Sequence, residues 1–366
     1  MQMKRKIVVL GSYGEFTRRV TIDVAAMPQV ECVLGLPPSA QATTFASAVG
    51  VPFMVIDPNE SSSLQRLLEG AFAVVNLHGP FATREHVAVA ARCAALGVHY
   101  VDPADAREYM TEFARLARDA RDHEALLVTG AGAVPAVAAA LVRMLVKEFD
   151  RVSEIHIFLA PGMGDQRELA TVQSILDQGD NPVRTKERGR RPKQHWRTKP
   201  EPVRFPEPVG VRRGWLCDLE RDALAREFGV GTVTTRTGFA PGFLSFMITI
   251  LEKLRQRGTV RELSPLIAWF VRRAAARRGR HSLGRASSIR VAVRGSRRNH
   301  DEEYVAYLVA RDGAGPAIAA APILALVRRW VEKGVKETGA VTCVDMLGFD
   351  DLRPELMNHN IVLVRE

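Results

Sequence analysis

The chain is poor in cysteine, and this excludes two kinds of architecture. Its 366 residues include four cysteines, which stand far apart at Cys32, Cys93, Cys217 and Cys343. They form no CxxC pair and no mixed cluster with histidine, so we expect neither a metal site nor a dense disulfide framework. Isolated thiols of this kind are typical of a reduced, cytoplasmic protein.

Long hydrophobic runs are also missing. The N-terminus is basic like that of a signal peptide, but the apolar run after it, Ile7–Leu10, ends at Gly11 and is too short for a signal-peptide core. The longest apolar stretch elsewhere, residues 239–251, falls short of the ~18 residues that cross a bilayer. We therefore expect no membrane span and a cytoplasmic protein, with peripheral contact to a membrane as the alternative.

Acidic residues are scarce in parts of the second half. The formal net charge is +10, yet residues 1–150 carry 14 basic and 16 acidic side chains, so the whole excess lies beyond them. Two stretches together carry more than the whole net charge: residues 184–213, with 11 basic and 3 acidic, and residues 272–298, with 10 basic and none acidic. Because no helix-turn-helix, zinc finger or aromatic RNA-binding motif accompanies this charge, we expect no sequence-specific binding of nucleic acid.

The basic stretch 272–298 leaves three interpretations open. Residues 264–278 have a helical pattern with an apolar face, and a basic amphipathic helix can lie on an anionic membrane surface. An acidic partner could instead bind through Arg272–Arg298. The third interpretation, which we favour, is a solvated arginine-rich face whose apolar stripe packs on its own domain.

Short apolar runs alternate with helical patterns over the first 130 residues. The runs lack polar alternation, as strands that are buried on both faces do. Helical patterns such as residues 86–96 separate them, which predicts an α/β fold with a Rossmann-type, doubly wound parallel sheet. The predicted strands are Ile7–Leu10, Val30–Leu34, Phe53–Ile56, Ala73–Leu77, His99–Val101 and Ala125–Val128.

The pattern changes after residue 150 and favours an α+β domain with a mostly antiparallel sheet. The predicted elements are strands at Glu154–Leu159, Thr232–Thr237, Ser288–Arg294 and Tyr304–Arg311, and helices at Phe243–Arg257, Ser264–Arg278 and Pro316–Lys333. The last two strands would pair around a turn at residues 295–301. We predict a dinucleotide-binding domain over residues 1–130, a substrate and dimerisation domain over 131–335, and a C-terminal segment, 336–366, that packs back on the first domain. We expect a homo-oligomer.

A glycine turn follows the first predicted strand and precedes a helical pattern, which is the context that a dinucleotide-binding fingerprint requires. Gly11 can make the tight turn, and Gly14 can let backbone N–H groups approach a pyrophosphate. Thr17 stands where a third glycine is expected, so we expect the helix to lie slightly farther from the strand.

The end of the second predicted strand lacks a cofactor-selecting residue. An acidic residue there would bind the ribose 2′-hydroxyl, and an arginine would favour a 2′-phosphate. The sequence instead reads Leu34-Gly-Leu36-Pro-Pro38, and Glu31 lies earlier, inside the strand. The residues thus leave the choice between NAD and NADP open.

Four motifs give the chain a family resemblance: Gly11–Phe16, Val74–Phe81, Ala91–Asp102 and Thr129–Pro135. In this order and spacing they resemble the saccharopine dehydrogenase-like family of NAD(P)-dependent oxidoreductases. Echoes at Leu169–Val172 and Gly313–Pro316 extend the likeness to most of the chain.

The resemblance implies a nicotinamide cofactor, NAD(P)(H), with NADP slightly favoured over NAD. It also implies chemistry at a carbon–nitrogen bond, either imine reduction or secondary-amine oxidation, on a small amino-acid-like or amine substrate that carries a carboxylate. The departures at Thr17 and Leu36 leave two alternatives: a binding or membrane-surface protein without redox activity, and an enzyme of different net chemistry that passes through a transient imine. The expected cofactor-binding residues are Gly11, Ser12, Tyr13, Gly14, Glu15, Phe16, Asn76, Gly79 and Pro80.

Three side chains near the ends of predicted strands are candidate catalytic residues. His78 follows a buried strand and titrates near neutral pH, although a loop histidine bonded to backbone is an equally good interpretation. Asp102 ends the next strand, and in the resembling family this carboxylate lies near the substrate amine; an N-cap for the helix after Pro103 is the alternative. Tyr100 is an admissible proton donor.

Substrate contacts are expected from four further residues. Gly130 and Gly132 open a helix, where backbone N–H groups can meet a carboxylate. Arg167 can bind an acidic group of the substrate through two parallel hydrogen bonds, and Thr171 lies close to it in sequence.

Overall fold

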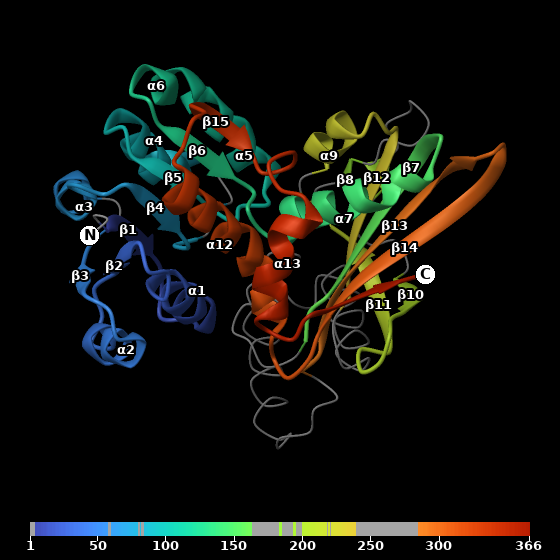
Figure 1. Ribbon diagram of the computed structural model, residues 1–366, viewed down its shortest axis with the longest axis horizontal. Coiled ribbons are helices and arrows are strands. Elements are labelled where there is room, and N and C mark those ends of the chain that lie inside the picture. Colours follow the sequence, from blue (N-terminus) through green and yellow to red (C-terminus); the bar gives the residue numbers. More distant parts are fainter. Residues whose placement is uncertain are drawn as a thin grey trace, which may run out of the picture. The chain divides into compact units, whose positions relative to one another are not determined.

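The chain forms two compact units in the computed structural model (Figure 1). The first contains Met1–Ala140 and Ala319–Glu355, and the second contains Leu141–Ile318 and Leu356–Glu366. The structure describes residues 4–57, 60–79, 81, 84–162, 183–184, 193–194, 200–217, 219, 221–238 and 285–366. The predicted helices 243–257 and 264–278 lie outside the described residues, as do Pro80, Arg167, Thr171 and Arg272–Arg280.

The first unit is built on a parallel sheet of seven strands in the order β15-β6-β5-β4-β1-β2-β3. This is a doubly wound order, in which the chain reverses its direction of travel between β1 and β4. The strands are β1 (Arg5–Leu10), β2 (Val30–Leu36), β3 (Phe53–Val55), β4 (Ala73–Asn76), β5 (His99–Val101), β6 (Leu126–Thr129) and β15 (Gly339–Thr342). The predicted Rossmann-type sheet is confirmed, and each of its six predicted strands is present.

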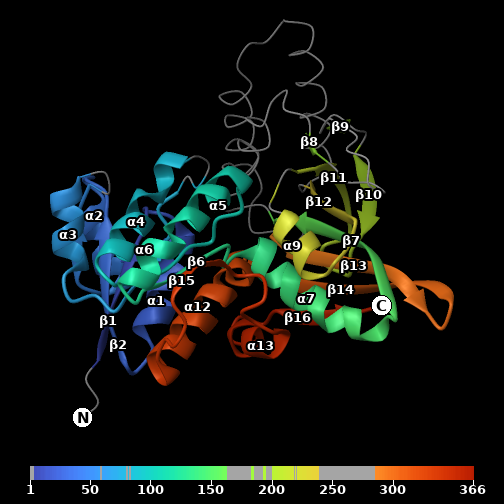
Figure 2. The same ribbon diagram turned by 90° about the horizontal axis from the view of Figure 1, so that it is seen from above.

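Helices cover both faces of this sheet (Figure 2). On one face, α3 to α6 bury Leu67, Cys93 and Tyr109 against strand residues such as Val74 and Leu127. Helices α1 and α12 lie on the other face. The described helices of both units are α1 (Glu15–Ala25), α2 (Ala42–Val49), α3 (Ser61–Leu68), α4 (Ala88–Ala95), α5 (Arg107–Phe113), α6 (Ala117–Asp122), α7 (Ala138–Leu145), α9 (Asp222–Glu227), α12 (Gly315–Lys333) and α13 (Phe349–Met357).

The C-terminal residues are divided between the two units. Gly339–Thr342 pairs in parallel with β6 and forms an edge of the first sheet, whereas Val362–Arg365 pairs with β14 of the second. Helix α12 belongs for the most part to the first unit. Sequence reasoning missed β15 because it has four residues and no long apolar run.

The second unit contains a mixed sheet in the order β10-β11-β12-β7-β13-β14-β16. Its β12 and β7 are parallel, and its other neighbouring pairs are antiparallel, which confirms the predicted mostly antiparallel sheet. The strands are β7 (Arg151–Ala160), β10 (Glu201–Arg204), β11 (Val211–Leu216), β12 (Thr232–Gly238), β13 (Ser287–Arg297), β14 (His300–Ala310) and β16 (Val362–Arg365). A separate pair joins β8 (Val183–Arg184) to β9 (Lys193–Gln194).

The β13–β14 hairpin turns more tightly than expected. Its strands run to Arg297 and resume at His300, so the turn consists of Arg298 and Asn299 rather than residues 295–301. Both turn residues have positive φ, 49° and 66°. Such a two-residue turn matches the right-handed twist of its strands.

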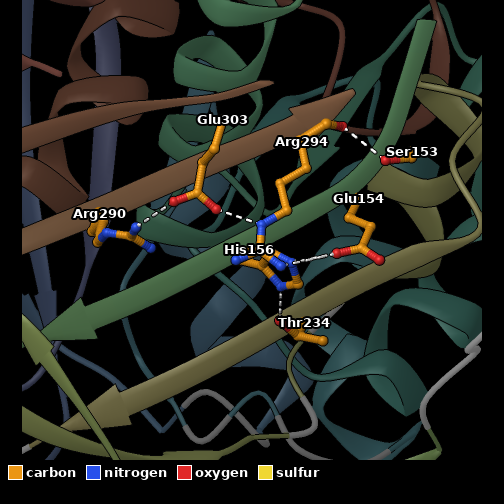
Figure 3. Close-up of polar contacts among 7 residues, drawn as sticks. All are labelled: Ser153, Glu154, His156, Thr234, Arg290, Arg294 and Glu303. Atoms are coloured by element: carbon orange, nitrogen blue, oxygen red, sulfur yellow. Dashed lines mark hydrogen bonds and ion pairs between the residues drawn. The ribbon is translucent and has the colours of Figure 1, made fainter. Parts of the chain in front are cut away.

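One face of the second sheet carries an ion-pair cluster (Figure 3). Arg294 lies 2.5 Å from Glu303 and 3.5 Å from Glu154, and Arg290 lies 3.3 Å from Glu303. His156 joins the cluster through Glu154, at 3.0 Å. These two arginines belong to the basic stretch 272–298, so part of its described charge is paired with glutamates. Binding of a membrane or an acidic partner through Arg272–Arg298 stays a prediction.

No helix in the described part of the chain combines the length and the hydropathy needed to cross a membrane.

Candidate functional site

The predicted site residues of the first unit gather at the carboxyl edge of its sheet. The glycine loop follows β1 and the 76–79 loop follows β4, and these two strands are hydrogen-bonded neighbours. They flank the point where the strand order reverses, which is where open α/β sheets bind ligands. The segments after β5 and β6 lie along the same edge, because all these strands are parallel.

Thr17 packs directly on Gly11. A Cβ atom placed on Gly11 would lie 2.3 Å from Thr17 Cγ2 and 2.6 Å from Thr17 Oγ1. The threonine is buried, and its hydroxyl accepts a hydrogen bond from the Ser12 N–H at 3.2 Å. The Thr17 side chain therefore fills the space that would be empty if residue 17 were a glycine. It fits there because Gly11 has no Cβ.

The N-terminus of α1 is open beside Gly14. This residue is the N-cap, with extended backbone angles, and no described side chain caps the first turn. A Cβ on Gly14 would find Ser12 Oγ at 3.9 Å as its one neighbour within 4 Å. The backbone N–H groups and the dipole at a helix N-terminus favour the binding of a phosphate. Glu15 lies in this first turn, where its ion pair with Arg18, at 2.8 Å, lowers the pKa of its carboxyl.

The loop after β2 offers no charged side chain. Leu36 is fully buried and pairs with Val55 of β3, and the following residues, 37–43, are neutral. Tyr13 ties this loop to the glycine loop, because its hydroxyl donates a hydrogen bond to the Pro37 carbonyl. Its ring also meets Phe45 of α2 edge-on, with centroids 5.7 Å apart. Phe16, another expected cofactor residue, is buried in the core.

His78 belongs to the 76–79 loop and contacts the glycine loop at Gly11. A hydrogen bond with the Gly11 backbone raises the pKa of its imidazole, but burial lowers it by more, so the pKa lies below its usual value. Its Nδ1 atom is buried and has no hydrogen-bond partner among the described residues. Gly79, which follows, is exposed.

Asp102 and Tyr100 lie inside the domain rather than on its surface, since both are 0% exposed. One oxygen of Asp102 accepts hydrogen bonds from Ala104 N–H at 2.9 Å and Thr129 Oγ1 at 2.7 Å. The other accepts one from Tyr109 Oη at 2.6 Å. Burial raises the pKa of the Asp102 carboxyl, and these bonds oppose the rise. Asp102 is not the N-cap of α5, because Ala106 occupies that position.

Tyr109 and Thr129 were missed by sequence reasoning. Both hydroxyls point at Asp102, from α5 and from the end of β6. A tyrosine on the buried face of a predicted helix ordinarily indicates core packing, so only its spacing from Asp102 could have drawn attention to it. Catalytic roles for Asp102 and Tyr100 stay predictions.

The glycines after β6 shape a tight turn. Gly130 has a φ of +80°, and a Cβ there would lie 2.9 Å from the Met110 side chain. Its N–H points at Asp102, 3.4 Å away. A Cβ on Gly132 would lie 3.1 Å from the Pro103 carbonyl oxygen. Both positions thus have a packing reason for glycine, and their contact with a substrate stays a prediction, as do the roles of Arg167, Thr171 and Pro80.

Residues 7–125 match the family model of the saccharopine dehydrogenase NADP binding domain. The N-terminal domain is therefore similar to the NADP binding domain of that family. The match confirms NAD(P) as the cofactor class of this domain, and a nicotinamide cofactor indicates an oxidoreductase. It takes in the glycine loop, His78 and Asp102.

Similar solved structures extend the likeness beyond the NADP binding domain. Apo saccharopine dehydrogenase (L-Glu forming) from Saccharomyces cerevisiae has a TM-score of 0.70 at 12% identity, over 99% of each chain. DAP dehydrogenase from C. glutamicum, in complex with DAP, has a TM-score of 0.53 at 13% identity, over 98% of this chain and 100% of its own. An engineered D-amino acid dehydrogenase bound to NADP+ has a TM-score of 0.53 at 12% identity, with the same coverage. At these identities the likeness is one of fold. No curated protein matches the chain in sequence.

Proposed function

We propose that this protein is an NAD(P)(H)-dependent dehydrogenase that acts on a carbon–nitrogen bond of an amino-acid-like substrate. The observation that carries the proposal is the NADP binding domain on a chain whose fold, along its whole length, is that of saccharopine dehydrogenase. The relatives named DAP dehydrogenase and D-amino acid dehydrogenase support an amino acid as substrate class. A small molecule that carries a carboxylate and an amine fits this class.

The residues at the sheet edge fit a dinucleotide. The open N-terminus of α1 beside Gly14 would hold the pyrophosphate, and the neutral loop after Leu36 would receive the adenosine ribose. Because this loop has no carboxylate to repel a 2′-phosphate, NADP(H) should bind at least as well as NAD(H). When bound, the cofactor supplies or accepts the hydride.

His78 is the residue that we propose for proton transfer. Oxidation of an amine to an imine would release one proton from nitrogen in addition to the hydride that a bound cofactor would accept, and water would then hydrolyse the imine. The imidazole is neutral at pH 7 because its pKa lies below the usual value, and its Nδ1 has no other described partner. His78 can accept the proton there and return it in the reverse direction.

Cofactor binding tests the proposal most directly. Gly14→Ala places a methyl group where the structure has room for it but where the pyrophosphate would approach. We expect the Kd for NADPH, measured by nicotinamide fluorescence, to rise at least about tenfold, equivalent to ~1.4 kcal/mol. The melting temperature should stay nearly constant. Gly231→Ala is the matched control, since a Cβ there likewise meets no clash and the residue lies in the second unit.

Turnover tests the chemistry. Wild-type protein with NADP+ or NADPH is given a panel of diamino acids, D-amino acids, saccharopine-like secondary amines and oxo-acid plus amine pairs, and absorbance at the nicotinamide band is followed with mass spectrometry of the products. We expect a coupled change in cofactor and in one C–N bond. No binding of either cofactor at millimolar concentration, or cofactor binding without any C–N turnover across the panel, would argue against the proposal.

A further inference from the structure

A chain of buried hydrogen bonds runs from Asp102 to the loop that carries His78. Tyr109 Oη donates to Asp102 at 2.6 Å, and the hydroxyls of Tyr109 and Tyr100 lie 3.2 Å apart. Asn76 Nδ2 donates to Tyr100 Oη at 2.9 Å, and Asn76 Oδ1 accepts the backbone N–H of His78 at 3.1 Å. The chain therefore joins the ends of β4 and β5 through α5.

The backbone N–H of His78 fixes the direction of the two bonds at Asn76. The His78 N–H can only donate, so it must meet the oxygen of the Asn76 amide, and the amide nitrogen then donates to Tyr100. Tyr109 donates to Asp102, and one further hydrogen bond joins the hydroxyls of Tyr109 and Tyr100. Burial and the nearby carboxylate hold the pKa of both tyrosines above the usual value, so both hydroxyls keep their protons at working pH.

The anchor of the chain is tightly held. The Asp102 carboxylate also accepts bonds from Ala104 N–H and Thr129 Oγ1, so three short bonds, of 2.6 to 2.9 Å, fix it against the neighbouring strand ends. Tyr109 touches the far side of the same loop as well, since its ring meets Phe81 edge-on with centroids 5.4 Å apart. Tyr109 thus contacts Phe81 directly and is linked to Asn76 through Tyr100.

We propose that Tyr109 is a positioning residue. Its hydroxyl links Asp102, which is held in place, to Tyr100 and through Tyr100 to Asn76, and these bonds hold the His78 imidazole in position. The inference deepens the proposed function and rests on it for the role of His78. Asp102 acts in the same chain as the anchor, without touching the substrate.

Tyr109→Phe tests the inference because it removes one hydroxyl and keeps the ring that packs on Phe81. We expect hydrogen–deuterium exchange of the His78 amide to accelerate by about tenfold, since its acceptor Asn76 is no longer held. In the enzyme assay kcat should fall about tenfold while KM for NADPH changes less than about threefold, because the pyrophosphate binds at α1.

Phe113→Leu is the matched control. Phe113 packs on the rings of both Tyr100 and Tyr109, with centroids 5.9 Å from each, but takes no part in the hydrogen bonds. It should lower the melting temperature and leave the exchange of the His78 amide and the kcat close to those of the wild type. Asn76→Ala combined with Tyr109→Phe should lower kcat no further than Asn76→Ala alone, because both changes break one chain.

Two results would overturn the inference: unchanged exchange of the His78 amide in Tyr109→Phe, or effects of Asn76→Ala and Tyr109→Phe on kcat that multiply. The inference would also be overturned if kcat falls in proportion to the melting temperature in both Tyr109→Phe and Phe113→Leu. If the wild type turns over no substrate, the proposed function fails, and the amide exchange still decides whether the chain holds the loop.

Discussion

The contact between Gly11 and Thr17 yields a sharp prediction about stability. Gly11→Ala would bring its methyl group to 2.3 Å from Cγ2, 2.6 Å from Oγ1 and 3.0 Å from Cβ of Thr17. The threonine is β-branched and buried, so it has few rotamers to escape into, and rotation would break its bond to the Ser12 N–H. The clash therefore cannot be relieved at little cost.

The magnitude follows from these two terms. Overpacking of a filled core costs about 1–3 kcal/mol, and the lost hydrogen bond adds ~1 kcal/mol, so we expect Gly11→Ala to cost about 3 kcal/mol. Thr17→Gly alone should cost about 2 kcal/mol through the lost bond and the lower helix propensity of glycine. In the double variant the clash is gone, so its stability should equal that of Thr17→Gly.

Thermal unfolding followed by circular dichroism measures the cycle. A loss of 3 kcal/mol corresponds to roughly 6–12 °C for a unit of this size. The two single changes should thus be strongly non-additive, with a coupling of about 3 kcal/mol in favour of the double variant. Additive losses, or a Gly11→Ala protein that melts like the wild type, would refute the assignment of Thr17 as the group that requires glycine at position 11.

Two further predictions concern the first unit. Burial and Arg5 lower the pKa of His99 to about 4, and its Nδ1 accepts the Leu126 N–H at 3.1 Å. Below pH ~6.5 the unfolded chain takes up a proton at this histidine, whereas the folded chain does not. We therefore expect the free energy of unfolding to fall by about 2 kcal/mol between pH 6.5 and 4, after allowance for the partial exposure of the ring. Urea unfolding of His99→Asn should show a flatter pH dependence than that of the wild type. Arg328 lies 2.7 Å from the buried Glu355, so Arg328→Ala should lower the free energy of unfolding by about 2 kcal/mol. Adding Glu355→Gln to this variant should recover part of the lost stability. A double variant that is less stable than Arg328→Ala would contradict this.

The sequence predicted the first sheet well because its strands are buried on both faces. Runs such as Ile7–Leu10 and Ala73–Leu77 have no competing interpretation once glycine turns bound them. β15 was not predicted because a strand of four residues shows no clear hydrophobic pattern. Its place beside β6 also depends on pairing with a strand that is far away in the sequence. The two-residue turn at Arg298 was missed because arginine rarely adopts positive φ and gives no turn signal.

The candidate site was predicted in outline and not in detail. Strand ends point to the correct edge of the sheet, so Gly14, His78 and Asp102 could be found from their positions alone. Their surroundings could not, because burial decides what each group does. Asp102 looks accessible in sequence, yet Tyr109 from the following helix closes over it, and this contact depends on how α5 packs.

The discontinuous first unit has a consequence for synthesis on the ribosome. β6 ends at Thr129, but its neighbour β15 begins at Gly339, and Trp330 of α12 accepts a hydrogen bond from Arg5 through its carbonyl. At about 5–20 residues per second, the gap takes on the order of 10–40 s to translate. During that interval the nascent sheet has an unpaired edge at β6 and lacks the cover of α12. Slow-translating cells should therefore expose this edge longest, and a shortened gene that ends near residue 130 should yield protein that aggregates.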